Sequence, residues 1–190
     1  NGNIIWEGPY WQNKHELIGV LDDKYLFLKN ENILGPIPLG EWTVPFQNLG
    51  YIADGETLEF PWVAQYIRMF NKDGDEIWNW NPFNHFSMED YDTFAGTWES
   101  ALLNLKYGWT HSNSLWFNES ESAIYLSSRS LSRITKIDYP SGNIIWIMGP
   151  DKKFGLGMEN ICTDLGFSMQ HHIQQLDNGN LLLFDNGNLS

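Results

Sequence analysis

One short pattern occurs three times in this 190-residue chain, and the repetition limits the folds that the chain can adopt. The pattern reads GNIIW at 2–6, GDEIW at 74–78 and GNIIW again at 142–146. In each copy, a glycine turn is followed by apolar residues, and the copy ends in tryptophan. This pattern is typical of the second strand of a β-hairpin. The preceding strand is visible as QYIRMF at 65–70 and RITKIDY at 133–139. A recurring hairpin predicts a repeat architecture.

A second repeating unit begins with a histidine. The segments that start at His15 and His171 align without a gap, and the segment that starts at His111 needs a few additional turn residues. Each of them has the turn and the alternating apolar residues of a hairpin. Joining the two units gives four-stranded antiparallel meanders, each of the size of one propeller blade.

The predicted fold is therefore all-β, a β-propeller of four-stranded antiparallel blades. We expect residues 1–190 to form a single partial propeller domain of about three blades. Its blade units are about 15–80 and 111–149, its partial blades are 1–8 and 171–190, and its insertions are about 30–63, 81–110 and 150–170. The predicted strands are 16–20, 24–29, 65–70 and 75–80 in one blade, and 112–117, 123–128, 133–139 and 143–148 in the next. Because an open run of blades leaves unpaired edges, we expect the chain to be part of a larger ring.

Charge and cysteine content exclude several classes of function. The formal net charge is −13 and no block of lysine or arginine occurs, so nucleic acid would be repelled. Cys162 is the only cysteine, which excludes an internal disulfide and a thiolate zinc site built from this chain alone. No apolar run approaches the length of about 18 residues that indicates a membrane-spanning helix.

Three histidines hold the same register in the repeat, at the start of the first strand of each hairpin. Because the first strands of propeller blades line the central channel, we expect His15, His111 and His171 to converge. Arg129 ends the second strand of the His111 hairpin and is expected to face the same mouth. Imidazole and guanidinium groups donate hydrogen bonds to tetrahedral oxyanions, and neutral imidazole is a nucleophile and proton carrier. The set indicates an anion site or a catalytic site.

Other interpretations of these residues stay open. The histidines cap strands in a non-catalytic binding scaffold, or they bind a metal ion as in a metal-dependent propeller hydrolase. Against a metal, Arg129 would place a fixed positive charge beside the cation, and no carboxylate shares the register. The insertions at 81–110 and 150–170 are rich in phenylalanine, tryptophan and glycine, and either wall an apolar pocket for an aromatic ring or fill the surface between blades. His85 lies in the first of them and is a rival to His15.

The most specific signal lies in residues 109–189, about two-fifths of the chain. They read WTHSNSLWFNESESAIYLSSRSLSRITKIDYPSGNIIWIMG and, further on, FSMQHHIQQLDNGNLLLFDNGN. The motifs are W-[TA]-H-x-N-S, S-S-R with its arginine eighteen residues after the histidine, and Q-H followed by F-D-N-G. Together they resemble the arylsulfate sulfotransferase family (arylsulfotransferase, ASST), whose members are six-bladed propellers that move sulfuryl groups without a nucleotide donor.

The resemblance implies a role for each candidate residue. His171, which follows a glutamine, corresponds to the nucleophile that is transiently sulfated. His111 and Arg129 correspond to the pair that holds the sulfuryl oxygens, and Asn113 is assigned with them to substrate binding. The remaining histidine of the family lies upstream in another blade, where repeat alignment selects His15.

The resemblance also implies the partners and the setting of the protein. It implies an aryl sulfate donor, a phenol acceptor and ping-pong kinetics through a sulfohistidine, with no organic cofactor and no metal. A periplasmic or secreted location and a homodimer are typical of the family. Some members have a disulfide in the loop before the nucleophile, and Cys162 lies in the corresponding insertion without a partner cysteine.

Overall fold

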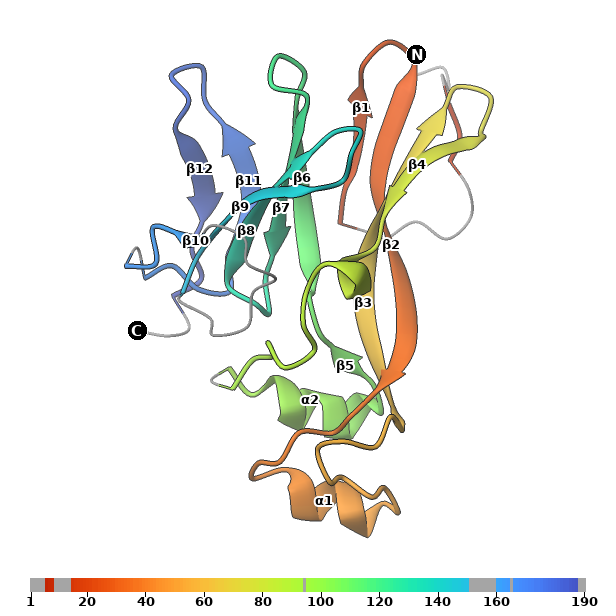
Figure 1. Cartoon of the computed structure of the whole chain (residues 1–190), viewed down its shortest axis with the longest axis vertical. Coiled ribbons are helices and arrows are strands. Elements are labelled where there is room, and N and C mark those ends of the chain that lie inside the picture. Colours follow the sequence, from red (N-terminus) through yellow and green to blue (C-terminus); the bar gives the residue numbers. More distant parts are fainter. Residues whose placement is uncertain (1–5, 9–14, 94, 151–159, 165, 188–190) are drawn as a thin grey trace, which may run out of the picture.

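The computed structural model describes residues 6–8, 15–93, 95–150, 160–164 and 166–187. The described part is mostly β, and its long ladders are antiparallel, as the hairpin repeat predicts. Figure 1 shows three sheets side by side, with the helices α1 (Thr43–Asn48) and α2 (Thr97–Asn104) at one end, beyond the long strands of the first sheet. None of the helices in these residues is long and apolar enough to span a membrane.

The first sheet contains the four strands predicted for the earlier blade, in the predicted order. They are β1 (Leu17–Val20), β2 (Lys24–Gly35), β3 (Phe60–Asn71) and β4 (Glu76–Trp80), and the short strand β5 (Tyr107–Gly108) pairs with β3 in parallel. β2 and β3 pair over their full lengths, from Lys24 opposite Asn71 to Gly35 opposite Phe60. The segment between the two strands is therefore shorter than the insertion predicted at 30–63. The ladder continues as far as Gly35, and the next residue, Pro36, has no backbone N–H to donate.

The second sheet is a complete four-stranded meander. It consists of β6 (Ser112–Asn118), β7 (Ala123–Ser128), β8 (Arg133–Asp138) and β9 (Ile144–Met148), with β10 (Asn160–Ile161) added in parallel at the β9 edge. Every residue of β7 is buried. A strand buried on both faces reads as a nearly continuous apolar run, which is how the sequence of β7 begins.

The two segments predicted to be partial blades differ in how much of them is described. β11 (His171–Gln175) and β12 (Leu181–Phe184) form a two-stranded antiparallel sheet, with a register shift between His171 and Ile173. Residues 188–190, and residues 1–5 of the predicted partial blade 1–8, lie outside the described part. Trp6 to Gly8 are not in a strand, and the ring of Trp6 stacks on Tyr25 with 4.1 Å between centroids.

The insertions contain helices that hairpin periodicity did not predict. These are α1 (Thr43–Asn48), the 3-10 helix η1 (Pro82–Asn84) and α2 (Thr97–Asn104). The aromatic residues around α2 are buried: Trp98 stacks on Tyr107 with 4.0 Å between ring centroids, and Trp62 contacts both rings edge-on. The aromatic side chains of the insertion 81–110 pack into the main core. This favours the second of the two interpretations, in which they fill the space between elements, over the wall of an apolar pocket.

The first two sheets share that core and are joined at its edge by tryptophan hydrogen bonds. The indole Nε1 of Trp80 donates to the Gly142 carbonyl at 2.9 Å, and that of Trp78 donates to the Pro140 carbonyl at 2.8 Å. Gly142 has a φ of +78°, a conformation that glycine adopts without strain. The GNIIW turn of one unit is thus the docking point for the GDEIW strand of the other.

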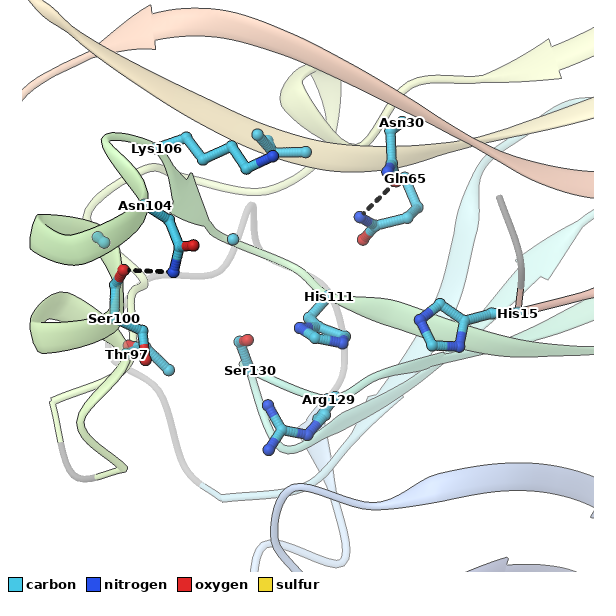
Figure 2. A pocket seen from close by; sticks show the side chains of 13 residues that line it. His15, Asn30, Gln65, Thr97, Ser100, Asn104, Lys106, His111, Arg129 and Ser130 are labelled. Carbon is cyan, nitrogen blue, oxygen red and sulfur yellow. Dashed lines mark hydrogen bonds between the residues drawn. The ribbon is translucent and has the colours of Figure 1, made fainter. Parts of the chain in front are cut away.

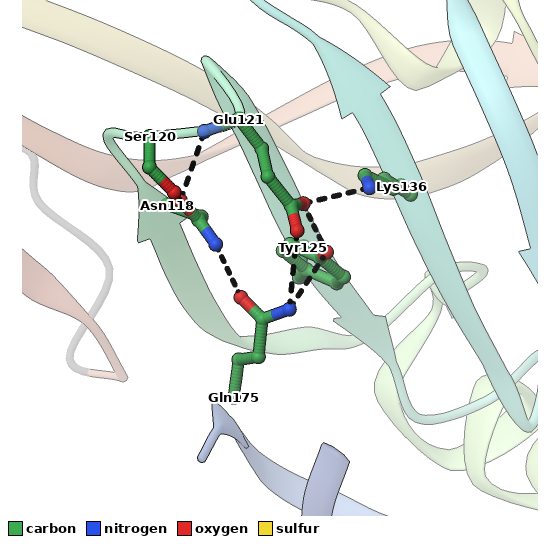
Figure 3. A network of polar contacts seen from close by, with 6 residues as sticks. All are labelled: Asn118, Ser120, Glu121, Tyr125, Lys136 and Gln175. Atoms are coloured by element: carbon green, nitrogen blue, oxygen red, sulfur yellow. Dashed lines mark hydrogen bonds and ion pairs between the residues drawn. The ribbon is translucent and has the colours of Figure 1, made fainter. Parts of the chain in front are cut away.

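A polar network attaches β11 to the second sheet (Figure 3). The amide nitrogen of Gln175 donates to the Tyr125 hydroxyl at 3.3 Å, and the same hydroxyl donates to the Glu121 carboxylate at 2.6 Å. Lys136 forms an ion pair with Glu121 at 2.7 Å. Because Gln175 lies at the end of β11, the network helps to fix the strand that begins with a candidate histidine.

Candidate functional site

A cavity of about 400 Å³ opens between the first two sheets and α2. His15, His111 and Arg129, which sequence analysis singled out, all line it. Figure 2 shows their side chains along one wall, with residues of the α2 segment on the facing wall. Residues from four separate segments thus meet in one space.

The backbone of His111 has an unusual conformation that its neighbours hold in place. Its φ is +44°, in the left-handed region that is sparsely populated by residues other than glycine. The Gln65 side-chain oxygen accepts hydrogen bonds from both flanking residues, from the Thr110 hydroxyl at 2.9 Å and from the Ser112 backbone N–H at 2.5 Å. Backbone conformations of this kind persist where surrounding contacts enforce them, and they cluster at functional sites.

Arg129 lies beside His111 because the two residues face each other at the open end of the β6–β7 hairpin. The backbone N–H of Arg129 donates to the His111 carbonyl at 3.2 Å. On the adjoining pair, the buried hydroxyls of Ser112 and Ser128 are 3.0 Å apart. The eighteen-residue spacing in the sequence therefore corresponds to a direct cross-strand pairing at the mouth of the β6–β7 hairpin.

His15 reaches the same site from another sheet. It lies just before β1, and its ring centroid is 5.7 Å from that of His111. His85, its rival, stacks on Trp80 with 4.6 Å between ring centroids and does not line the cavity. Of the two upstream histidines, only His15 is therefore near His111 and Arg129.

His171 is half-buried at the start of β11 and does not itself line the cavity. Its Nδ1 atom is 2.9 Å from the side-chain nitrogen of Asn186, which also donates to the Met169 carbonyl at 2.6 Å. Arg129 and His15 are both close enough to lower the pKa of this imidazole electrostatically. The four candidate residues are thus electrostatically connected.

Asn113, which the resemblance assigns to substrate binding, lies behind the residues that line this cavity. It is buried, it is not among the residues that line the cavity, and its side-chain nitrogen donates to the Gln170 carbonyl at 2.8 Å. Gln170 is itself fully buried, and its amide nitrogen donates to the Arg133 carbonyl at 3.0 Å. Asn113 therefore holds the backbone that leads into His171.

Burial and the positive charge of Arg129 favour the neutral form of the His111 and His171 imidazoles. Burial, followed by Arg129 and the other two histidines, lowers the pKa of His111 to about 4. Burial and then Arg129 lower the pKa of His171, and the Met169 carbonyl partly opposes this effect. Desolvation and like charges both disfavour the protonated form of a histidine. At neutral pH, both rings have a lone pair available.

The lowered pKa of His111 predicts a pH-dependent stability. Because folding shifts this pKa from 6.5 to about 4, the unfolded chain binds more protons between these values. The free energy of unfolding should therefore be highest above about pH 6.5 and decrease toward about pH 4, losing about 2 kcal/mol between about pH 7 and 5. Urea unfolding at these pH values measures it. In His111→Asn, the free energy of unfolding should decrease much less over this pH range. In the control His172→Asn, a substitution at an exposed position, it should decrease as in the wild-type protein. An equal decrease in the two variants would contradict the prediction.

The titratable groups that line the cavity are all basic. Among the described residues that line it there is no aspartate or glutamate, although the chain contains 24 of them. In the same part of the chain, no three histidine, cysteine, aspartate or glutamate side chains are grouped so that they could hold a metal ion. The guanidinium and imidazole donors instead match the oxygens of a tetrahedral anion.

Sequence reasoning missed Gln65 and the polar residues of α2 that line the cavity. Gln65 has a weak signal, because it is a polar residue within the largely apolar strand β3 and is buried. The α2 residues have none, since they stand in an insertion outside the hairpin register. Their place at the cavity depends on how the insertion folds back over β3 and β5.

Comparison with known proteins agrees with this geometry. A search of curated proteins found no significant match. The model of the family described as Arylsulfotransferase (ASST) matches residues 55–190. The matched range contains His111, Arg129 and His171 and most of the cavity wall, and it confirms the family that the motifs indicated. With more than half of its length matched, the chain belongs to the arylsulfotransferase family.

Proposed function

We propose that this protein transfers a sulfuryl group from a phenolic sulfate ester to a phenolic acceptor through a sulfohistidine, without the nucleotide donor PAPS. The observation that carries the proposal is the hydrogen-bonded pair of His111 and Arg129 in a cavity whose described lining residues include no carboxylate. His171, within electrostatic reach of both, supplies a neutral imidazole. Family membership supports the same chemistry.

In the first half-reaction, a ring nitrogen of His171 attacks sulfur. The S–N bond forms while the bond between sulfur and the aryl oxygen breaks, and the electron pair of that bond leaves with the phenolate oxygen. We assign the attack to Nε2, because Nδ1 faces Asn186 and the Met169 carbonyl. Attack by Nε2 uses the neutral tautomer whose proton is on Nδ1, and in that tautomer the Asn186 side-chain nitrogen turns away from Nδ1 and keeps its hydrogen bond to the Met169 carbonyl.

Arg129 and His111 hold the non-bridging oxygens while sulfur changes partners. The guanidinium fork and the imidazole N–H donate to oxygens whose charge grows as the ester bond lengthens, which is the form of stabilisation that contributes most in group transfer. His15, whose ring is 5.7 Å from that of His111, is the proposed proton donor to the departing phenolate. In the second half-reaction the phenol acceptor loses its proton to His15, its oxygen attacks sulfur, and the S–N bond breaks.

The arrangement of the sheets supports a proposal for the fold. We infer that the two meanders and the β11–β12 hairpin are successive blades, or parts of blades, of a β-propeller, so that 1–190 is one partial propeller domain. The support is the shared four-stranded order of the sheets and the common register of the three histidines at the starts of their first strands. A periplasmic or secreted location and a homodimer, both typical of the family, belong to the same proposal.

A transfer assay tests the function. The protein is mixed with 4-nitrophenyl sulfate and phenol, and both nitrophenolate and phenyl sulfate are measured. Arg129→Gln should lower kcat/KM by about 100- to 1000-fold, because removal of one preorganised donor to a developing oxyanion has effects of this size. The control Arg68→Gln, on β3 and paired with Glu31 and Glu76, should retain activity.

Other functions give different results in this assay. A non-catalytic scaffold would bind the sulfate ester and release no nitrophenolate. A metal-dependent hydrolase would release nitrophenolate without phenyl sulfate and would be inhibited by a chelator. Full activity of Arg129→Gln would refute the role of the guanidinium.

A further inference from the structure

The wall of the cavity opposite Arg129 is formed by one face of α2. Thr97, Ser100, Ala101 and Asn104 line it, and their spacing of three and four residues places them on a single helix face. In Figure 2, Ser100 and Asn104 lie across the space from His111 and Arg129. This wall is polar except for one alanine, whereas the aromatic residues next to it are buried in the core.

Lys106, two residues after α2, adds a positive charge to this wall. It lines the cavity and is exposed, and it forms no ion pair with a carboxylate among the described residues. It stands on the α2 side of the space, whereas Arg129 stands on the hairpin side (Figure 2). The cavity therefore has a fixed cation at each of two facing walls.

Two of the residues that line the cavity are small. Val63 and Gly108 line the cavity and are cross-strand partners in the β3–β5 ladder. A Cβ atom at Gly108 would lie 3.9 Å from Nδ1 of His111, so the glycine leaves space beside that ring. A flat ring can therefore lie here, with one substituent toward Arg129 and another toward Lys106.

The distribution of charge argues that Lys106 has a ligand. Acidic residues outnumber basic ones by 24 to 11 in the chain, so a cavity that contains Lys106 and has no carboxylate among its described lining residues is unusual here. Two other surface cavities contain acidic residues: Glu41, Asp92 and Glu99 in one, and Glu119, Glu121 and Asp177 in the other. Among the described residues that line the cavity, the fixed charges are those of Arg129 and Lys106, and two positive charges concentrate an anionic ligand against the repulsion of the rest of the surface.

We propose that the preferred donor is an aryl sulfate with a second anionic group, such as a carboxylate, which Lys106 and the Asn104 amide bind at the wall opposite the sulfuryl group. This inference rests on the proposed function and specifies its substrate class. Lys106 is a specificity-determining residue in this scheme and takes no part in bond breaking.

Two matched donors test the inference, 4-sulfooxybenzoate and its neutral amide 4-sulfooxybenzamide. Both carry the same sulfate, and their para substituents differ in charge; because the substituents also change the acidity of the phenol that leaves, the test compares the ratio of the two kcat/KM values between variants. The wild-type protein should have a kcat/KM about three- to fivefold higher for the carboxylate, since a partly exposed charge pair contributes up to about 1 kcal/mol. Lys106→Met should bring the ratio of kcat/KM for the carboxylate to that for the amide down to about one, and Lys72→Met, which replaces an exposed lysine in the β3–β4 turn, should retain the wild-type ratio.

Calorimetric binding of both donors to the His171→Asn variant provides a readout without turnover. The carboxylate should bind more tightly than the amide, and the difference should vanish when Lys106→Met is added. Equal use or equal binding of both donors by the wild-type Lys106 protein would overturn the inference and leave the proposed function standing. If neither donor is bound or turned over, both proposals fail.

Discussion

Replacement of His171 by asparagine is expected to abolish the burst of phenol that the wild-type protein releases from an aryl sulfate. In a ping-pong reaction, the first turnover leaves the sulfuryl group on the nucleophile and releases one phenol per site. Burial and Arg129 keep this imidazole neutral, so its lone pair is available at neutral pH. An asparagine has no ring nitrogen that can carry the group, and kcat/KM should fall by about 10⁴-fold or more.

Rapid mixing of enzyme with 4-nitrophenyl sulfate, without acceptor, measures the burst. The matched control is His172→Asn at the neighbouring position, which is exposed and has a φ of +54° that asparagine tolerates. This control should show a full burst, and mass spectrometry should detect sulfation of the wild-type and control proteins only. A full burst from His171→Asn would refute the assignment of the nucleophile.

Replacement of Arg133 by methionine should produce the largest loss of stability among these predictions. Arg133 and Asp90 form an ion pair whose side chains are 4% and 0% exposed, and the guanidinium lies over the ring of Phe86. Removing one partner leaves a buried charge without compensation, which destabilises a protein by about 3–5 kcal/mol. Since small domains are stable by only about 5–15 kcal/mol, much of the folded population would be lost.

Urea denaturation monitored by tryptophan fluorescence measures this effect. Lys136→Met is the control, because the side chains of its ion pair with Glu121 are 16% and 36% exposed, and removal of a pair that reaches solvent changes stability by about 1 kcal/mol or less. Adding Asp90→Asn to Arg133→Met should recover part of the loss, since it removes the isolated charge. A change below 1 kcal/mol for Arg133→Met would show that the pair contributes little.

The sequence predicted the strands well because a hairpin is a local structure. The strands expected at 112–117 and 123–128 are found at Ser112–Asn118 and Ala123–Ser128. Turn residues and alternating apolar residues lie within a few positions of each other in a hairpin, so their pattern is readable without knowledge of distant segments. The same reasoning placed Arg129 beside His111, since both lie at the open end of one hairpin.

The helices of the insertions were not predictable in this way. α2 has only eight residues, and its Trp98 becomes buried through contacts with Trp62 and Tyr107, which belong to strands of the first sheet. Short helices are stabilised mainly by tertiary packing of one face and weakly by their own residues. The extension of β2 to Gly35 likewise depends on its partner strand, which begins at Phe60.

The sequence by itself determined the hairpins, the family and the register of three histidines, because these depend on neighbouring residues and on motifs. Only the tertiary structure decided that Asn113 holds the Gln170 backbone and that Gln65 clamps the flanks of His111. It also decided that Lys106 faces the same space as Arg129. Such contacts join residues 20 to 60 positions apart, as in the 45 between Gln65 and Thr110 and the 57 between Asn113 and Gln170. They form only when sheets and insertions pack together, and no local pattern records which distant side chains will then meet.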